Sequence, residues 1–314
     1  MCASVQRAKL TRVGSAVEPG GLSDVIRSSV RRAPARSGGA SPAGAAALIA
    51  AALLCAGPVR ADEVIRLSGT GSALGAMARV ARAYEAATPG AKVQVLSSLG
   101  TSGAIKAVAG GAIEVGLAAR PLRPEERVFG LTAVPVAWTP FVFAAGPRAG
   151  GGGIGLAELV RIYRGEQRSW PGGERIRPVL RPAGDADTAY LRGLSPELAA
   201  AYDAALARPG MLIGATNQDS DELAGRTPGS LGSTTLAQLT TEPHGLTPLA
   251  WEGVAPTLAN LAAGRYPLWK PFYAVAPASA PPRTARFLSF LKSAEARTIL
   301  EAAGCLPPPF PARG

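Results

Sequence analysis

Two glycine-rich segments carry the residue types best suited to bind an anion. Residues 68–72 (SGTGS) and 97–103 (SSLGTSG) each join a short apolar stretch to a stretch with helical periodicity. Each segment is therefore predicted to begin a helix, where free N–H groups and the positive end of the helix dipole attract anions. Hydroxyl groups add donors, and glycines allow close approach of the backbone. The candidate ligand-binding residues in these segments are Thr70, Gly71, Ser72, Thr101, Ser102 and Gly103.

Ordinary helix capping is the alternative interpretation of either segment alone, because Ser and Thr are common N-cap residues. Two such segments after neighbouring strands favour a binding site, because both open at the carboxyl edge of one parallel sheet. A third segment, residues 181–188 (RPAGDADT), also lies between a predicted strand and a predicted helix. Arg181 there can donate a fork of hydrogen bonds to an oxyanion, or else form a surface salt bridge with Asp185 or Asp187.

Catalytic and metal-binding chemistry finds little support in the sequence. The one histidine, His244, lies in a turn-like segment, and no His/Cys cluster has the spacing of metal ligands. The motif Gly-x-Ser-x-Gly does not occur. Asp185 and Asp187 are two residues apart, so they do not face each other on a helix. We therefore expect no catalytic residue, no metal site, no cofactor and no enzyme, and a secreted hydrolase is the alternative with least support.

Predicted strands alternate with predicted helices along the chain, which is typical of an α/β fold with a mainly parallel sheet. A linker-like stretch, residues 146–155, separates two such regions. The predicted strands are residues 64–67, 92–96, 113–118, 176–180, 211–215 and 230–234. The predicted helices are residues 72–87, 101–109, 157–163, most of 185–207, and a last helix that carries Phe287, Phe290, Leu291, Ile299 and Leu300.

The first 61 residues resemble an export signal. Residues 43–56 form an apolar run after a basic stretch that contains Arg31, Arg32 and Arg36, and a cleavage site is predicted after Ala61. A buried alanine-rich helix is the alternative. Cleavage would leave Cys305 as the one cysteine, which excludes an intramolecular disulfide. The sequence thus predicts a periplasmic or secreted protein.

Composition excludes two further classes of protein. Hydrophobic residues make up 47% of the 314 residues, too many for a wholly disordered chain. The net charge of +11 invites a nucleic-acid partner. More than half of this excess lies in residues 1–61, however, and the remainder is spread rather than clustered. We therefore expect no nucleic-acid partner.

The order and spacing of several segments resemble those of a periplasmic phosphate-binding protein of ABC transporters (PstS-like). The similarity covers most of residues 65–300. Arg181 matches the phosphate-binding arginine of that family, and Arg120 occurs in the corresponding turn of some relatives. The segments that carry the resemblance are residues 68–72, 97–106, 114–122 (EVGLAARPL), 156–170 (LAELVRIYRGEQRSW) and 227–232 (TPGSLG).

Three departures from the family pattern affect the expected site. Ala118 and Ala119 stand where the family has Asp or Ser, and Ser233 replaces Tyr. Asp185, Asp187 and Thr188 occupy the place of a Ser-Gly-Thr motif, so the resemblance makes them candidate ligand-binding residues. Near a phosphate dianion the two carboxylates would repel the ligand, unless one is protonated or accepts the proton of monohydrogen phosphate.

The resemblance implies a two-lobe α/β fold of the periplasmic-binding-protein type, in which each lobe is a mainly parallel sheet flanked by helices. It implies crossings at residues 141–145 and 272–275, with lobe 1 formed by residues 62–143 plus 271–314 and lobe 2 by residues 144–270. The implied function is capture of a small oxyanion, phosphate first, by a monomer that docks on an ABC permease in the inner membrane. The alternatives are a changed ligand, either zwitterionic or another oxyanion, and a sensor or scaffold role without transport.

Overall fold

The computed structural model describes residues 63–310. The predicted leader and signal peptide, residues 1–61, lie outside the described residues. Within residues 63–310, no helix has both the length and the apolar character needed to cross a membrane.

One mixed sheet runs through this part of the chain, in the order β2-β1-β3-β11-β4-β8-β6-β7, with β9 paired to β4. The strands at each end are parallel, whereas β4 and β11 are antiparallel to each other and to their outer neighbours. The bounds are β1 Glu63–Gly69, β2 Ala91–Val95, β3 Val115–Ala118, β4 Leu131–Ala145, β6 Arg177–Leu180, β7 Leu212–Ile213, β8 Ser230–Thr235, β9 Thr247–Pro248 and β11 Trp269–Pro277. A separate pair is formed by β5 Gly153–Ile154 and β10 Ala250–Trp251.

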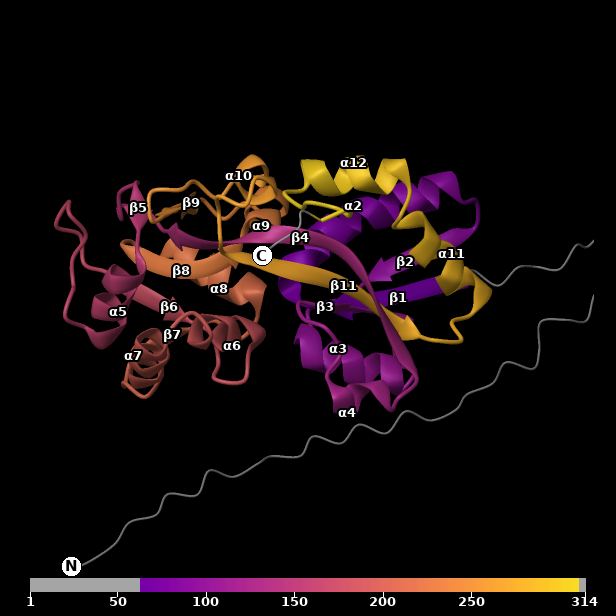
Figure 1. Cartoon of the computed structure of the whole chain (residues 1–314), viewed down its shortest axis with the longest axis horizontal. Coiled ribbons are helices and arrows are strands. Elements are labelled where there is room, and N and C mark those ends of the chain that lie inside the picture. The colour runs from indigo at the N-terminus through magenta and orange to yellow at the C-terminus, as the bar shows by residue number, and fades with distance from the viewer. Residues whose placement is uncertain (1–62, 311–314) are drawn as a thin grey trace, which may run out of the picture. The chain divides into compact units, whose positions relative to one another are not determined.

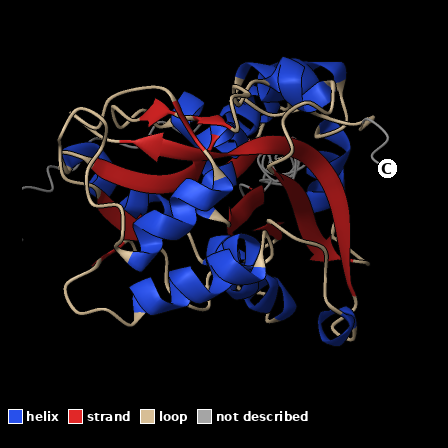
Figure 2. Ribbon diagram, turned by 60° about the vertical axis from the view of Figure 1, so that its left-hand side comes forward, coloured by secondary structure: helices blue, strands red, loops and turns tan. Residues whose placement is uncertain are grey.

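Helices lie on both faces of the sheet, and β4 and β11 extend across both groups of elements (Figures 1 and 2). One group contains α2 Gly71–Ala87, α3 Gly100–Ala109, α4 Pro124–Arg127, α11 Pro282–Phe290 and α12 Ala294–Ala302. The other contains α5 Leu156–Arg164, α6 Ala186–Arg192, α7 Pro196–Leu206, α8 Asn217–Arg226, α9 Leu236–Thr241 and α10 Leu258–Ala262.

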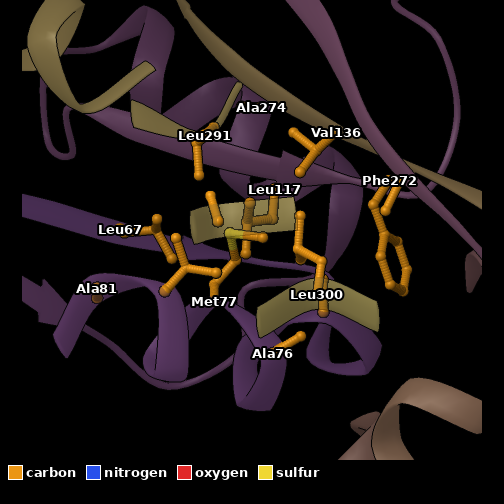
Figure 3. Packing of buried hydrophobic residues seen from close by; sticks show 14 of the residues in the cluster. Leu67, Ala76, Met77, Ala81, Leu117, Val136, Phe272, Ala274, Leu291 and Leu300 are labelled. Carbon is orange, nitrogen blue, oxygen red and sulfur yellow. The ribbon is translucent and has the colours of Figure 1, made fainter. Parts of the chain in front are cut away.

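Each half of the sheet has its own apolar core. In the first half, Met77 of α2 points among Leu67, Leu117 and Leu300 (Figure 3). A smaller cluster around Ile105 covers the α3 side of the same strands. The second half has a separate core, whose large members are Phe141, Phe143, Tyr163, Tyr202, Trp251 and Tyr266. Because the two apolar cores are separate, a ligand site can lie between them, where the two halves of the sheet meet.

The strand β4 changes partners at the junction of the halves. It pairs with β11 through Pro140 and with β8 from Phe141 onward. The predicted crossing at residues 141–145 therefore lies just beyond this exchange. The predicted crossing at residues 272–275 is displaced, because Tyr273–Val275 pair with β3 inside the first half. The chain passes from the second half to the first just before β11 begins, where the Phe141 amide donates a hydrogen bond to the Leu268 carbonyl.

The predicted elements are present, with two differences. The strand predicted at residues 211–215 contains only Leu212–Ile213 in regular pairing. The last helix is two helices, because Ser293 starts a new one by accepting a hydrogen bond from the Ala296 amide at 3.1 Å. A serine that caps a helix in this way interrupts an apolar pattern that otherwise continues across the break.

Candidate functional site

A cleft of about 470 Å³ lies where the two halves of the sheet meet. The first half contributes the start of α3 and the turn between β3 and α4. The second half contributes the turn between β6 and α6, and β11 contributes one lysine, Lys270. Six of the predicted ligand-binding residues line this cleft: Thr101, Ser102, Gly103, Arg120, Arg181 and Asp185.

The other five predicted residues do not line the cleft. Thr70 and Ser72 are buried, and their hydroxyl oxygens lie 3.0 Å from each other. The helix that they begin is covered by α8, since the Gln218 side chain donates to the Gly71 carbonyl at 3.0 Å. A Cβ on Gly71 would lie 2.3 Å from the Gln218 oxygen. The first glycine-rich segment thus forms a contact between the halves, and glycine at position 71 makes this close contact possible.

The second glycine-rich segment presents open donors to the cleft. Leu99, at the N-cap of α3, gives the helix no side-chain cap. Thr101 instead accepts a hydrogen bond from the Ala119 amide at 3.0 Å, which fixes the turn after β3 against the helix. The Gly100 N–H donates to the Ser98 hydroxyl at 3.3 Å, and the N–H groups that follow, from Thr101 onward, remain available to an anion.

Arg181 is held rigidly at the end of β6. Its side chain is 2% exposed. One guanidinium nitrogen donates to the Asp185 carboxylate at 2.8 Å and another to the Gly214 carbonyl at 2.6 Å. Asp185 is also the N-cap of α6 and accepts from the Asp187 amide at 2.8 Å. The salt bridge considered for Arg181 exists, but at the cleft rather than on the surface, and the arginine and its carboxylate both line the site.

Asp187 and Thr188 lie beneath the cleft. Asp187 is 1% exposed, and its two oxygens accept from the Lys270 ammonium and from the Asn217 amide, the latter at 3.0 Å. The Thr188 hydroxyl contacts the carbonyls of Arg181 and Pro182 at 3.1 and 2.9 Å. Thr188 thus stabilises the turn that holds Arg181. Neither residue lines the cleft, because both are occupied by protein partners.

Arg120 lines the cleft but is already paired. Its guanidinium makes two hydrogen bonds of 2.7 Å to Glu126 and one of 3.2 Å to the Ser102 hydroxyl. These hydrogen bonds lower the pKa of Glu126 to about 2. Arg120 therefore contributes less positive charge to a ligand than an unpaired arginine would.

Lys270 and Asn217 were missed by the sequence interpretation. Lys270 interrupts the apolar stretch of β11, and a lysine inside an apolar strand is the one signal that points to it. Asn217 stands at the start of α8, where its identity indicates only a helix beginning. Both meet Asp187 through contacts across 83 and 30 residues of sequence, which no local pattern reports.

A second buried carboxylate, Asp221 of α8, lies behind this network. It is 2% exposed and accepts a hydrogen bond of 2.6 Å from the Thr234 hydroxyl. Burial raises its pKa to about 7 against the opposing effect of the Thr234 hydrogen bond, with smaller contributions upward from Asp187 and Glu242 and downward from Arg181. Asp221 therefore titrates near neutral pH in the folded protein.

The described residues offer neither a metal-binding cluster nor a reactive thiol. Residues 63–310 contain no group of three or more His, Cys, Asp or Glu side chains that could hold a metal ion. Cys305 is fully buried, and burial raises the pKa of its thiol to about 12. A thiol in that state is a packing residue rather than a nucleophile.

These features define an α/β protein with a ligand-sized cleft between two halves joined by two crossing strands. Residues 40–295 match the family model described as the PBP superfamily domain, and the chain belongs to this family. The expected two-lobe fold and the resemblance to PstS-like proteins are confirmed at this level, as is the expectation of a binding protein rather than an enzyme.

Individual relatives are more distant. The chain is 28% identical to the phosphate-binding protein PstS of Bacillus subtilis (strain 168) over 64% of its own length and 66% of that protein, just under two thirds. Its fold is similar to that of a putative phosphate ABC transporter substrate-binding protein of Clostridium perfringens, with a TM-score of 0.67 and 20% identity. The match covers 78% of this chain and 100% of that protein. The fold is also similar to that of a periplasmic molybdate-binding protein of Azotobacter vinelandii, with a TM-score of 0.53 and 18% identity. This match covers 78% of this chain and 99% of that protein.

Proposed function

We propose that this protein captures a small oxyanion for an ABC-type importer, with phosphate as the first candidate ligand. The observation that carries the proposal is Arg181, a buried guanidinium fixed in the wall of the cleft that the start of α3 also lines. Fixed N–H donors together with one cationic side chain provide what an oxyanion needs when it leaves water. The phosphate-binding relatives support phosphate as the first ligand, and the molybdate-binding one supports the wider oxyanion class.

The family supports the accompanying proposals. We place the protein in the periplasm or outside the cell, as a monomer that delivers its ligand to a permease of the inner membrane. We also propose lobe limits at residues 62–143 plus 271–314 and residues 144–270. The exchange of partners by β4 at Pro140 and Phe141 lies close to these limits and supports them.

The pairing of both acids favours an oxyanion over a zwitterion as the ligand. Asp185 accepts from Arg181, and Asp187 accepts from Lys270 and Asn217. Each carboxylate already has a cationic protein partner, which disfavours a second cationic group from a zwitterion. A fully ionised oxyanion such as sulfate is a second candidate, because it needs no acceptor for a ligand proton.

Calorimetric titration of the ligand-stripped, refolded protein tests the proposal. We expect phosphate to bind to the folded wild type, with sulfate as the comparison anion. Replacement Arg181→Ala should lower the affinity at least tenfold, equivalent to ~1.4 kcal/mol. A folded protein that binds neither anion contradicts the proposed function. Unchanged affinity in Arg181→Ala removes this arginine from the site.

A further inference from the structure

A second buried cation lies at the cleft, on the strand that joins the two halves. We infer that Lys270 is a ligand-binding residue whose ammonium contacts the oxyanion together with Arg181. This inference rests on the proposed function, since it concerns the same site. Lys270 is 2% exposed, lines the cleft and lies at the end of β11 where the chain enters the first half.

The hydrogen bonds of Lys270 leave donors unused. An ammonium group carries three N–H donors and no acceptor. Among residues 63–310 its one hydrogen-bond partner is Asp187. The ring of Phe141, with its centroid 5.8 Å from the ammonium, lies alongside. A buried charged donor with unmet hydrogens is costly unless a further acceptor completes its shell, and an oxyanion in the cleft supplies that acceptor.

Asp187 then has a positioning role. One of its oxygens accepts from Lys270, and the other accepts from Asn217 at 3.0 Å. The carboxylate therefore faces the lysine, and it holds the ammonium of this cleft-lining residue in place. This arrangement gives a reason for an acid at a position where the resembled family has a hydroxyl: the acid balances the charge of a lysine that lines the cleft.

The three donor groups approach the cleft from three directions. The start of α3 belongs to the first half, Arg181 belongs to the second, and Lys270 lies on the strand between them. A tetrahedral oxyanion carries oxygens that point in several directions, so it can satisfy all three groups at once. A second cation also favours a dianion over a monoanion, because the attraction grows with ligand charge.

A purely structural ion pair is the competing explanation, and paired variants separate the two. Either single change at this pair leaves a buried charge without its counter-ion, which is destabilising. The asparagine oxygen of Asp187→Asn can still accept a hydrogen bond from Lys270, whereas Lys270→Met leaves Asp187 with no donor from position 270. We therefore compare Asp187→Asn with the double variant Lys270→Met/Asp187→Asn, which removes the pair in a balanced way. Lys292→Met, an exposed lysine outside the cleft, is the matched control.

The expected result is a loss of at least tenfold in phosphate affinity between Asp187→Asn and the double variant, measured by calorimetry. Sulfate, if it binds, should show a similar loss, whereas Lys292→Met should match the wild type. Equal affinities in Asp187→Asn and the double variant overturn the inference while wild-type binding upholds the proposed function. Absence of binding by the folded wild type contradicts the proposed function itself.

A measurement on the wild type covers the case in which the double variant does not fold. The chain has five lysines, Lys9, Lys92, Lys106, Lys270 and Lys292, so lysine-labelled NMR spectra are simple. Of the four among the described residues, only Lys270 is buried. We expect its side-chain ammonium signal to shift on saturation with phosphate while the signals of Lys106 and Lys292 stay in place. An unshifted Lys270 signal in a saturated protein overturns the inference.

Discussion

Asp185 shows how one residue can hold a binding group and oppose the ligand at the same time. Its carboxylate fixes the Arg181 guanidinium and caps α6, yet its side chain is 18% exposed to the cleft. A negative charge at this position repels an anion, and the pairing with Arg181 reduces the positive charge that the ligand meets. Affinity should therefore be below what the same cleft would show with a neutral cap.

Replacement Asp185→Asn tests this balance. Asparagine is an equally good N-cap, so α6 should keep its start. We expect oxyanion affinity to rise about threefold to tenfold, equivalent to about 0.7–1.4 kcal/mol, as measured by calorimetry. Asp203→Asn, an acid that is 51% exposed and pairs with Arg192, is the control and should leave affinity unchanged. A loss of phosphate affinity with sulfate affinity unaffected would show instead that Asp185 accepts the ligand proton.

At the scale of elements, the local pattern predicted what lies within each strand, turn and helix. The segment 97–103 leads into α3 and Arg181 directly follows β6, as the pattern predicted, and residues 98–103 and Arg181 line the cleft. The pattern did not show which turn each helix packs against. The contact between Gln218 and Gly71 spans 147 residues of sequence, and it covers the first glycine-rich segment. Lys270 was missed for the same reason, since its role depends on Asp187 of a distant helix.

Gly214 links two of these elements. Its carbonyl accepts from Arg181 at 2.6 Å, and a Cβ at this position would lie 2.4 Å from the Ser220 Cα of α8. The backbone of α8 thus lies directly against the turn that orients the arginine. A side chain here must push apart the helix and the turn, because protein interiors are close-packed.

Replacement Gly214→Ala should therefore disturb stability and binding together. We expect a loss of about 1–3 kcal/mol in the free energy of unfolding, the usual cost of overpacking. Phosphate affinity should fall at least threefold, because the backbone carbonyl that orients Arg181 is displaced. Gly172→Ala is the control, since a Cβ there meets no atom within 4 Å. Denaturant unfolding and calorimetry on both variants give the comparison, and wild-type stability in Gly214→Ala would refute the close contact.

At the scale of the whole molecule, one sheet carries both cores and the site between them. The strands β4 and β11 belong to both halves, so the donors of the cleft are attached to a common framework. The buried polar network of the second half lies directly behind these donors: Asp187 contacts Lys270, and Asp221 lies close enough for Asp187 to raise its pKa. Ionisation of a group in this network therefore changes the free energy of unfolding of the whole protein.

Asp221 makes the stability of the molecule depend on pH near neutrality. Its pKa is about 7 in the folded protein against an ordinary value of 3.8, chiefly because of burial. Between these values the folded protein binds more protons than the unfolded chain, so stability falls as pH rises from about 4 through 7 and the loss is complete above that range. The separation of the two pKa values corresponds to a cost on the order of 4 kcal/mol.

Replacement Asp221→Asn should remove this dependence. The free energy of unfolding of the variant relative to wild type should therefore increase by a few kcal/mol between pH 4 and pH 8, measured by denaturant unfolding at each pH. Glu222→Gln is the control, because Glu222 is 58% exposed and forms an ion pair with Arg226 in the next turn. Its stability relative to wild type should stay constant to about 0.5 kcal/mol from pH 5 to pH 8. A difference between Asp221→Asn and wild type that does not change with pH would mean that Asp221 stays ionised in the folded protein.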